Sequence, residues 1–231
     1  MPKQKSQARL CCAGRLKERP IRHSQRLSWP SILTVAKMVV SGFIPLAQWA
    51  AIFLPTLYVG IAAQDSVHIV NAIKTNTPPK VLAKQWLEVY RQGPFWVIPV
   101  VLLSIASNAL LALNAPNPNH RILYGLSAIL MWSIPLTTIF IFEPGVNGAC
   151  KIKAAQVLTD EGLKFPDKGS SSLPIPGKHS ASPATRAWAE RREVGMESVA
   201  GSWARQNVGR VGIALVAAGI SGFASLGRRS F

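Results

Sequence analysis

The stretch ILYGLSAILMWSIPLTTIFIF, residues 122–142, contains no acidic or basic side chain. A transmembrane helix requires about 20 mainly apolar residues, because the hydrocarbon core is about 30 Å thick and each helical residue rises about 1.5 Å. This stretch has that length and composition. It therefore predicts a helix that crosses a membrane.

Three further segments share this character: residues 43–63, 95–113 and 208–226. A single apolar run of such length could be a buried helix of a soluble protein, but several in one chain of 231 residues indicate a membrane protein. We predict an all-α fold: an integral, multi-pass bundle of four transmembrane helices that contacts the lipid bilayer.

The formal net charge of +16 is concentrated outside these segments. Residues 1–36 are basic and predict a disordered tail, followed by a membrane domain over residues 37–231. The positive-inside rule places both ends in the cytosol. The Arg-rich, acid-poor tail also fits a mitochondrial presequence, but we favour an endomembrane location. Without interleaved aromatic residues, the tail gives no reason to expect nucleic acid as a partner.

Two segments lead from residue 164 to the fourth apolar run. Residues 164–185, KFPDKGSSSLPIPGKHSASPAT, are rich in Ser, Pro and Gly and predict a flexible linker. Residues 186–207 predict an amphipathic helix on the membrane surface that leads into the last span.

The sequence shows no metal or cofactor motif. Cys11, Cys12 and Cys150 form no CxxC pair, and no P-loop, GxGxxG or GxSxG is present. Asp65 and His68 would share a helix face, but a non-haem iron site requires a second histidine. A polar pair at the membrane edge is the simpler interpretation. We expect no metal and no bound cofactor.

The sequence EPGVNG, residues 143–148, follows the third apolar run directly. Pro144 lacks a backbone N–H and Gly145 tolerates positive φ, so the stretch predicts the end of the span and a turn. The residues that follow predict a short amphipathic helix whose Lys151 and Lys153 reach lipid headgroups.

Two aromatic stripes precede the second and fourth spans. Trp86 and Tyr90 are four residues apart, and Trp203, Asn207 and Arg210 follow with spacings of four and three. On an α-helix each set lies on one face. Tryptophan and tyrosine often mark the membrane interface, and arginine snorkels to it. Asn207, by contrast, favours a face turned to the bundle interior.

The ordered set QWLEVYRQGP, EPGVNGACKIKAAQVL and SWARQNVGRVG around membrane spans resembles the anthrone oxygenase-like family of small multi-pass membrane proteins. The resemblance extends over roughly residues 43–226. Asn207 stands where many members of that family have histidine.

The resemblance implies oxidation of an anthrone-like aromatic polyketide to a quinone by O2, without a cofactor. The partner would be a hydrophobic aromatic small molecule. In this hypothesis Arg210 and Asn207 stabilise the enolate oxygen, and Asp65, His68 and Glu143 are candidate bases. Substrate-binding positions implied by the resemblance are Trp203, Trp86, Tyr90 and Asn147.

Two other functions remain open at this point. A member of the family that has lost the reaction would be a membrane scaffold or binding protein, an alternative favoured by Asn207. A small transporter subunit would need polar residues along the bundle axis, where Gln48, Ser104 and Asn108 are the candidates. Self-association into a homo-oligomer is compatible with each of these functions.

Overall fold

The computed structural model describes residues 29–161 and 181–227. The chain divides into two compact units, Met1–Ser41 and Gly42–Phe231. Of the first unit, the structure describes only the helical backbone from Trp29 onward. The first eight of those residues belong to the predicted disordered tail and are helical instead. Residues 1–28 of the predicted tail, and most of the predicted linker, lie outside the described residues.

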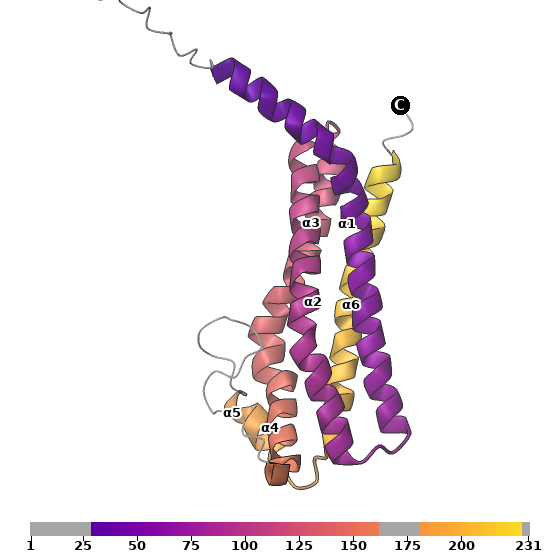
Figure 1. Cartoon of the computed structure of the whole chain (residues 1–231), viewed down its shortest axis with the longest axis vertical. Coiled ribbons are helices and arrows are strands. Elements are labelled where there is room, and N and C mark those ends of the chain that lie inside the picture. Colours follow the sequence, from indigo (N-terminus) through magenta and orange to yellow (C-terminus); the bar gives the residue numbers. More distant parts are fainter. Residues whose placement is uncertain (1–28, 162–180, 228–231) are drawn as a thin grey trace, which may run out of the picture. The chain divides into compact units, whose positions relative to one another are not determined.

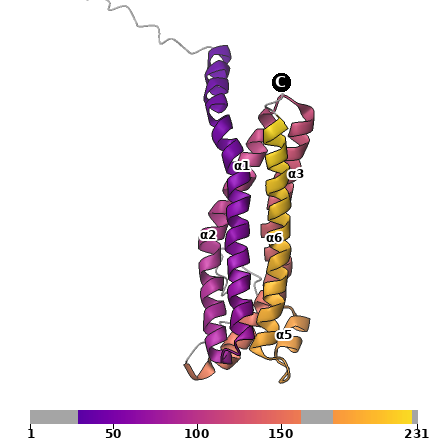
Figure 2. The same ribbon diagram turned by 90° about the vertical axis from the view of Figure 1, so that its right-hand side faces the viewer.

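The described residues form helices and no strand, which confirms the all-α prediction. The elements in chain order are α1 (Trp29–Lys74), α2 (Pro79–Asn114), α3 (Pro118–Thr137), the π-helix η1 (Thr138–Asn147), α4 (Gly148–Val157), the 3₁₀ turn η2 (Thr159–Glu161), α5 (Pro183–Ala189) and α6 (Met196–Leu226). Within the second unit, α1, α2, α3 and α6 run side by side and alternate in direction (Figures 1 and 2). The short α5 and α4 lie together at one end of the bundle (Figure 1).

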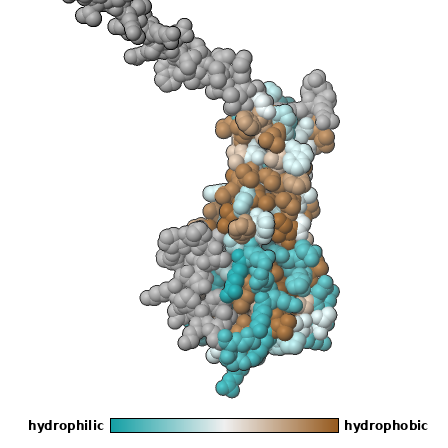
Figure 3. Space-filling view, in the orientation of Figure 1, coloured by the Kyte–Doolittle hydropathy of each residue, from teal (hydrophilic) through white to brown (hydrophobic). Residues whose placement is uncertain are grey.

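Four helical segments are long and apolar enough to cross a membrane: Gly42–Lys74, Pro79–Asn114, Pro118–Val157 and Met196–Leu226. The predicted four-span membrane protein is confirmed at this level. Large apolar side chains such as Trp49, Leu103, Ile129 and Phe223 are exposed, as expected for contact with lipid. One face shows an apolar band above a hydrophilic lower end (Figure 3).

The four segments able to cross a membrane are longer than the hydrocarbon core is thick. At about 1.5 Å per residue, the 31 residues of α6 extend about 46 Å, against about 30 Å of hydrocarbon. One end of each helix therefore extends into the polar region, and the hydrophilic end of the bundle holds α4 and α5 (Figures 1 and 3).

A buried polar ladder joins the helices in the apolar half of the bundle. The Ser221 hydroxyl donates to Asn108 Oδ1 at 2.8 Å, and Ser127 Oγ lies 2.8 Å from Ser221 Oγ. These groups bond one another across α2, α3 and α6, so they act as interhelical crosslinks. The arrangement of Asn108 therefore gives no support to the transporter hypothesis.

The predicted turn after the third span is wrong in one respect: the chain does not leave the bundle there. It continues through η1 into α4, with non-helical angles only at Gly145 (φ −96°, ψ −116°). A wide π-helical turn accommodates Pro144, which has no N–H to donate. The result is a kink, and Glu143 and Asn147 stay buried.

The segment 186–207 is also divided differently from the prediction of one surface helix. Residues after α5 form a turn, and α6 begins at Met196 and continues without interruption to Leu226. Met196, Val199 and Trp203 are buried in the core. The apolar stripe of this segment therefore packs against the bundle, because burial against α1, α2 and α4 removes more apolar surface from water than the interface would.

Residues Ala181 and Ser182 cross closely over the kink. The Ser182 backbone N–H donates to the Pro144 carbonyl at 2.8 Å. A Cβ added at Gly148 would lie 2.8 Å from both Cα and Cβ of Ala181 and 3.0 Å from the Glu143 carbonyl oxygen. Only glycine therefore permits this approach.

Gly148→Ala is expected to lower the free energy of unfolding by about 1–3 kcal/mol, because the added methyl group must displace backbone atoms. Chemical unfolding in detergent micelles measures the change. The matched control is Gly209→Ala, also in a helix, where an added Cβ meets no described atom within 4 Å. Equal stability of the two variants would contradict the prediction.

Candidate functional site

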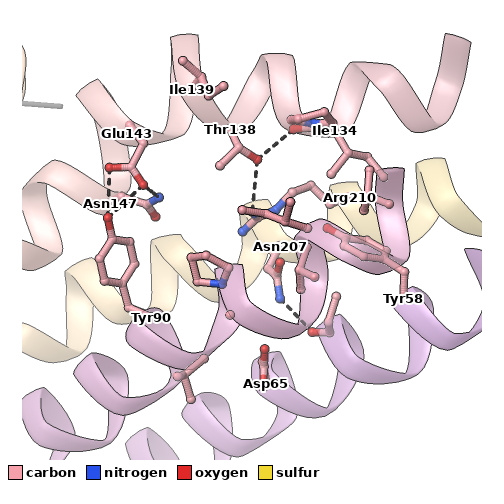
Figure 4. Close-up of a pocket in the computed structure, with 18 of the residues that line it drawn as sticks. Tyr58, Asp65, Tyr90, Ile134, Thr138, Ile139, Glu143, Asn147, Asn207 and Arg210 are labelled. Atoms are coloured by element: carbon pink, nitrogen blue, oxygen red, sulfur yellow. Dashed lines mark hydrogen bonds between the residues drawn. The ribbon is translucent and has the colours of Figure 1, made fainter. Parts of the chain in front are cut away.

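A cavity of about 310 Å³ lies between the four long helices. Its lining is mainly apolar, with a few polar side chains (Figure 4). The polar and aromatic lining residues are Tyr58 and Asp65 of α1, Tyr90 of α2, Trp132 of α3, Thr138, Glu143 and Asn147 of η1, and Trp203, Asn207 and Arg210 of α6.

The charged lining residues stand at the ends of the apolar runs. Asp65 is the first charged residue after the apolar run of α1, Glu143 follows that of α3 and η1, and Arg210 precedes that of α6. All three line one cavity. The cavity is therefore located where the apolar half of the bundle meets its hydrophilic end, and it offers both environments to a ligand.

The α6 wall contains the predicted stripe. Trp203, Asn207 and Arg210 all line the cavity, so this stripe faces the bundle interior and is not an interfacial belt. Arg210 Nη1 donates to Thr138 Oγ1 at 3.4 Å, and the guanidinium carbon lies 4.7 Å from the centre of the Phe142 ring. Arg210 Nε is buried without a hydrogen-bond partner among the described residues.

Asn207 connects α6 to α1. Its amide nitrogen donates to the Ala62 carbonyl at 2.7 Å and to Ser66 Oγ at 2.8 Å. Both amide hydrogens are thus used in contacts between helices. This geometry assigns Asn207 a structural contribution that the helical spacing alone did not predict.

Glu143 is the centre of a buried polar cluster. Its carboxylate accepts from Asn147 Nδ2 at 2.8 Å, from Lys151 Nζ at 2.7 Å and from the Tyr90 hydroxyl at 3.0 and 3.1 Å (Figure 4 shows the contacts with Tyr90 and Asn147). Lys151 Nζ also lies 4.8 Å from the centre of the Tyr90 ring. A carboxylate that accepts three donors is poorly placed to act as a base.

The prediction that Lys151 and Lys153 reach lipid headgroups is wrong. Lys151 is buried against Glu143, and Lys153 Nζ donates to Gln156 Oε1 at 3.0 Å and to the Arg191 carbonyl at 3.1 Å. Both ammonium groups have found partners inside the protein. An unpaired charge could not be buried in this way, so the partners explain the location.

Glu143→Leu is expected to lower the free energy of unfolding by about 3–5 kcal/mol, because it leaves the Lys151 ammonium buried without its partner. Unfolding in detergent measures the loss. The double variant Glu143→Leu with Lys151→Met should recover part of it, since no uncompensated charge remains. Simple addition of the two single effects would contradict a coupled pair.

Asp65 differs from Glu143 in its surroundings. It lines the cavity and is half-buried, and within the described part of the chain it has no hydrogen bond or ion pair. It lies within electrostatic range of Arg210. His68, predicted beside it, also lies within electrostatic range of Asp65, but it is exposed and is not a lining residue.

The predicted aromatic pair on α2 is divided between core and cavity. Trp86 is fully buried and does not line the cavity. It stacks on Tyr90 with ring centres 5.0 Å apart, and Tyr90 is the residue that reaches the lining. Trp86 therefore supports the wall from behind, by fixing the Tyr90 ring.

Sequence reasoning missed two polar lining residues, Tyr58 and Thr138. Tyr58 precedes Asp65 by seven positions, which places both on one face of α1, so its spacing was a usable signal. Thr138 had no such signal, since its position depends on the π-helical turn. Among the described residues, no three His, Cys, Asp or Glu side chains lie together as metal ligands would.

The fold and the site define the class: a multi-pass, α-helical membrane protein with a cavity between its helices, at the polar boundary of its apolar segments. The sequence model described as anthrone oxygenase matches residues 86–220, more than half of the chain. The chain belongs to the anthrone oxygenase family. The matched region contains three walls of the cavity, and α1 lies before it. No curated protein and no solved structure matches the chain.

Proposed function

We propose that the protein is a membrane-bound oxygenase that oxidises an anthrone-like aromatic polyketide to a quinone with O2 and needs no cofactor. The observation that carries this proposal is the pairing, in one apolar cavity, of Asp65 on α1 with Arg210 on α6. The first offers a proton acceptor and the second a fixed positive charge. Membership of the anthrone oxygenase family supports the same activity.

The reaction is chemically balanced without a further reductant. Removal of one proton from the central methylene group gives an enolate, which transfers one electron to O2. The resulting carbon radical and superoxide combine to form a carbon–oxygen bond, and the peroxide takes up a proton. Loss of the second methylene hydrogen with cleavage of the O–O bond then gives the quinone carbonyl and water.

The lining residues suggest a role for each side of the cavity. Asp65 takes the methylene proton, since its carboxylate has no competing donor among the described residues. Arg210 stabilises the negative charge on the enolate oxygen. Trp203 and Tyr90 contact the flat rings, and Asn207 holds α6 against α1 so that the two charged groups keep their relative positions.

The direct test compares O2-dependent conversion of a hydroxylated anthrone by membranes with and without the protein. Spontaneous oxidation by empty membranes is subtracted. A rate well above that background supports the oxygenase. A rate equal to background would overturn it and favour the scaffold or binding function, in which a family member retains the cavity without the reaction.

A further inference from the structure

Asn147 carries a buried acceptor that is not used within the described part of the protein. The residue lines the cavity and is 3% exposed, yet its carbonyl oxygen Oδ1 has no hydrogen-bond partner. A buried acceptor without a donor is unfavourable, and such groups are rare in native folds. A donor supplied by a ligand would explain this one.

The orientation of the Asn147 amide is determined by its neighbour. Lys151 Nζ lies 2.7 Å from Glu143 and stabilises the ionised carboxylate. An ionised carboxylate can only accept hydrogen bonds, so Asn147 must turn its NH2 group toward Glu143, at 2.8 Å. The carbonyl oxygen is then necessarily directed away from Glu143 (Figure 4).

Two polar neighbours in the cavity lining use their donors elsewhere. The Tyr90 hydroxyl donates to Glu143, and the Asn207 amide donates to α1. Apart from Tyr90, the α2 residues that line the cavity, such as Val89 and Pro94, have no polar side chain. The cavity thus presents donors from Arg210 and, at Asn147, a buried amide acceptor that no described residue uses.

We propose that Asn147 Oδ1 accepts a hydrogen bond from a hydroxyl group of the ligand, so that the cavity selects flat aromatic ligands with a free phenolic hydroxyl. This inference rests on the proposed function, in which a ring oxygen of the ligand faces Arg210. Lys151 is a positioning residue in this arrangement, since it acts on the ligand only through Glu143 and Asn147.

Three quinones of nearly equal size test the proposal: anthraquinone, 1-hydroxyanthraquinone and 2-hydroxyanthraquinone. The 1-hydroxyl bonds internally to the adjacent ring carbonyl, whereas the 2-hydroxyl has no internal partner. Binding to the purified full chain in detergent is measured by quenching of tryptophan fluorescence, at mildly acidic pH so that the hydroxyl stays protonated. Quinones are not oxidised further, so binding does not depend on turnover.

The wild type is expected to bind 2-hydroxyanthraquinone about ten-fold or more tightly than the other two quinones. Only this ligand offers a free hydroxyl to the Asn147 carbonyl oxygen, and a buried acceptor left without a donor weakens binding. Asn147→Leu should bring the three affinities within about three-fold of one another, mainly by weakening binding of the 2-hydroxy compound. Equal affinities in the wild type, or an unchanged preference in Asn147→Leu, would overturn the proposal. The wild-type comparison is decisive even without the variant.

Ile98→Val is the matched control, because it trims an apolar lining residue of α2 and changes no polar group. It should change all three affinities by a similar factor. The two proposals also fail separately. A protein that discriminates among the quinones but does not oxidise anthrones would overturn the oxygenase alone. One that oxidises anthrones without discrimination would overturn the role of Asn147 alone.

Discussion

Asp65→Asn is expected to lower kcat for anthrone oxidation by about 10²–10⁴, because a general base contributes that much. Asparagine has nearly the same size and keeps the polar contact with the cavity, so the fold should be unaffected. The measurement is initial O2 uptake with an anthrone substrate, with spontaneous oxidation subtracted. Binding of a quinone product should change little, since that step needs no base.

Two controls make the interpretation of Asp65 specific. His68→Ala, on the same helix but exposed and outside the cavity, should retain wild-type turnover. Asp65→Glu keeps a carboxylate and should retain part of the activity. If Asp65→Asn turns over at the wild-type rate, another group removes the proton and the assignment of Asp65 is wrong.

Arg210→Ala is expected to lower kcat by about 10²–10³, the usual cost of removing one fixed group that stabilises a developing oxyanion. The guanidinium contacts only a threonine hydroxyl and the Phe142 ring among the described residues, so its loss leaves no charged partner buried and unpaired in direct contact. Initial rates of anthrone oxidation check the prediction. Full activity in this variant would remove Arg210 from the mechanism.

Arg210→Lys distinguishes charge from geometry. Lysine keeps the positive charge but lacks the planar fork of the guanidinium. Partial recovery relative to Arg210→Ala would indicate that charge near the enolate is the main contribution. A rate as low as that of Arg210→Ala would indicate that the orientation of the N–H groups matters as much.

The membrane spans and one wall of the site could be predicted from the sequence. Runs without charge predict a spanning helix because the bilayer acts on each residue through its hydropathy alone. The shared helix face of Trp203, Asn207 and Arg210 could also be predicted, since residues four and three positions apart lie on one face whatever surrounds the helix. The family resemblance implied Asn147 as a substrate-binding residue, and in the structure it lines the cavity.

The Glu143 cluster could not be predicted in this way. Pro144 and Gly145 indicate a helix end by local rules, and a π-helical turn instead carries the chain onward because the segment packs against its neighbours. The sequence predicts that Lys151 and Lys153 contact lipid headgroups, because it does not reveal the partner of either residue inside the protein. Ion pairs of this kind depend on distances across the fold, which residue spacing does not contain.

What the sequence by itself determined is therefore the class of the protein, a bundle of four apolar helices, and which residues share a helix face. Only the tertiary structure decided which of the ionisable residues are partnered. Glu143 is held by three donors, whereas Asp65 has none among the described residues. Hydropathy and helical period are properties of neighbouring residues along the chain, but the pairing of charges depends on which helices are brought together.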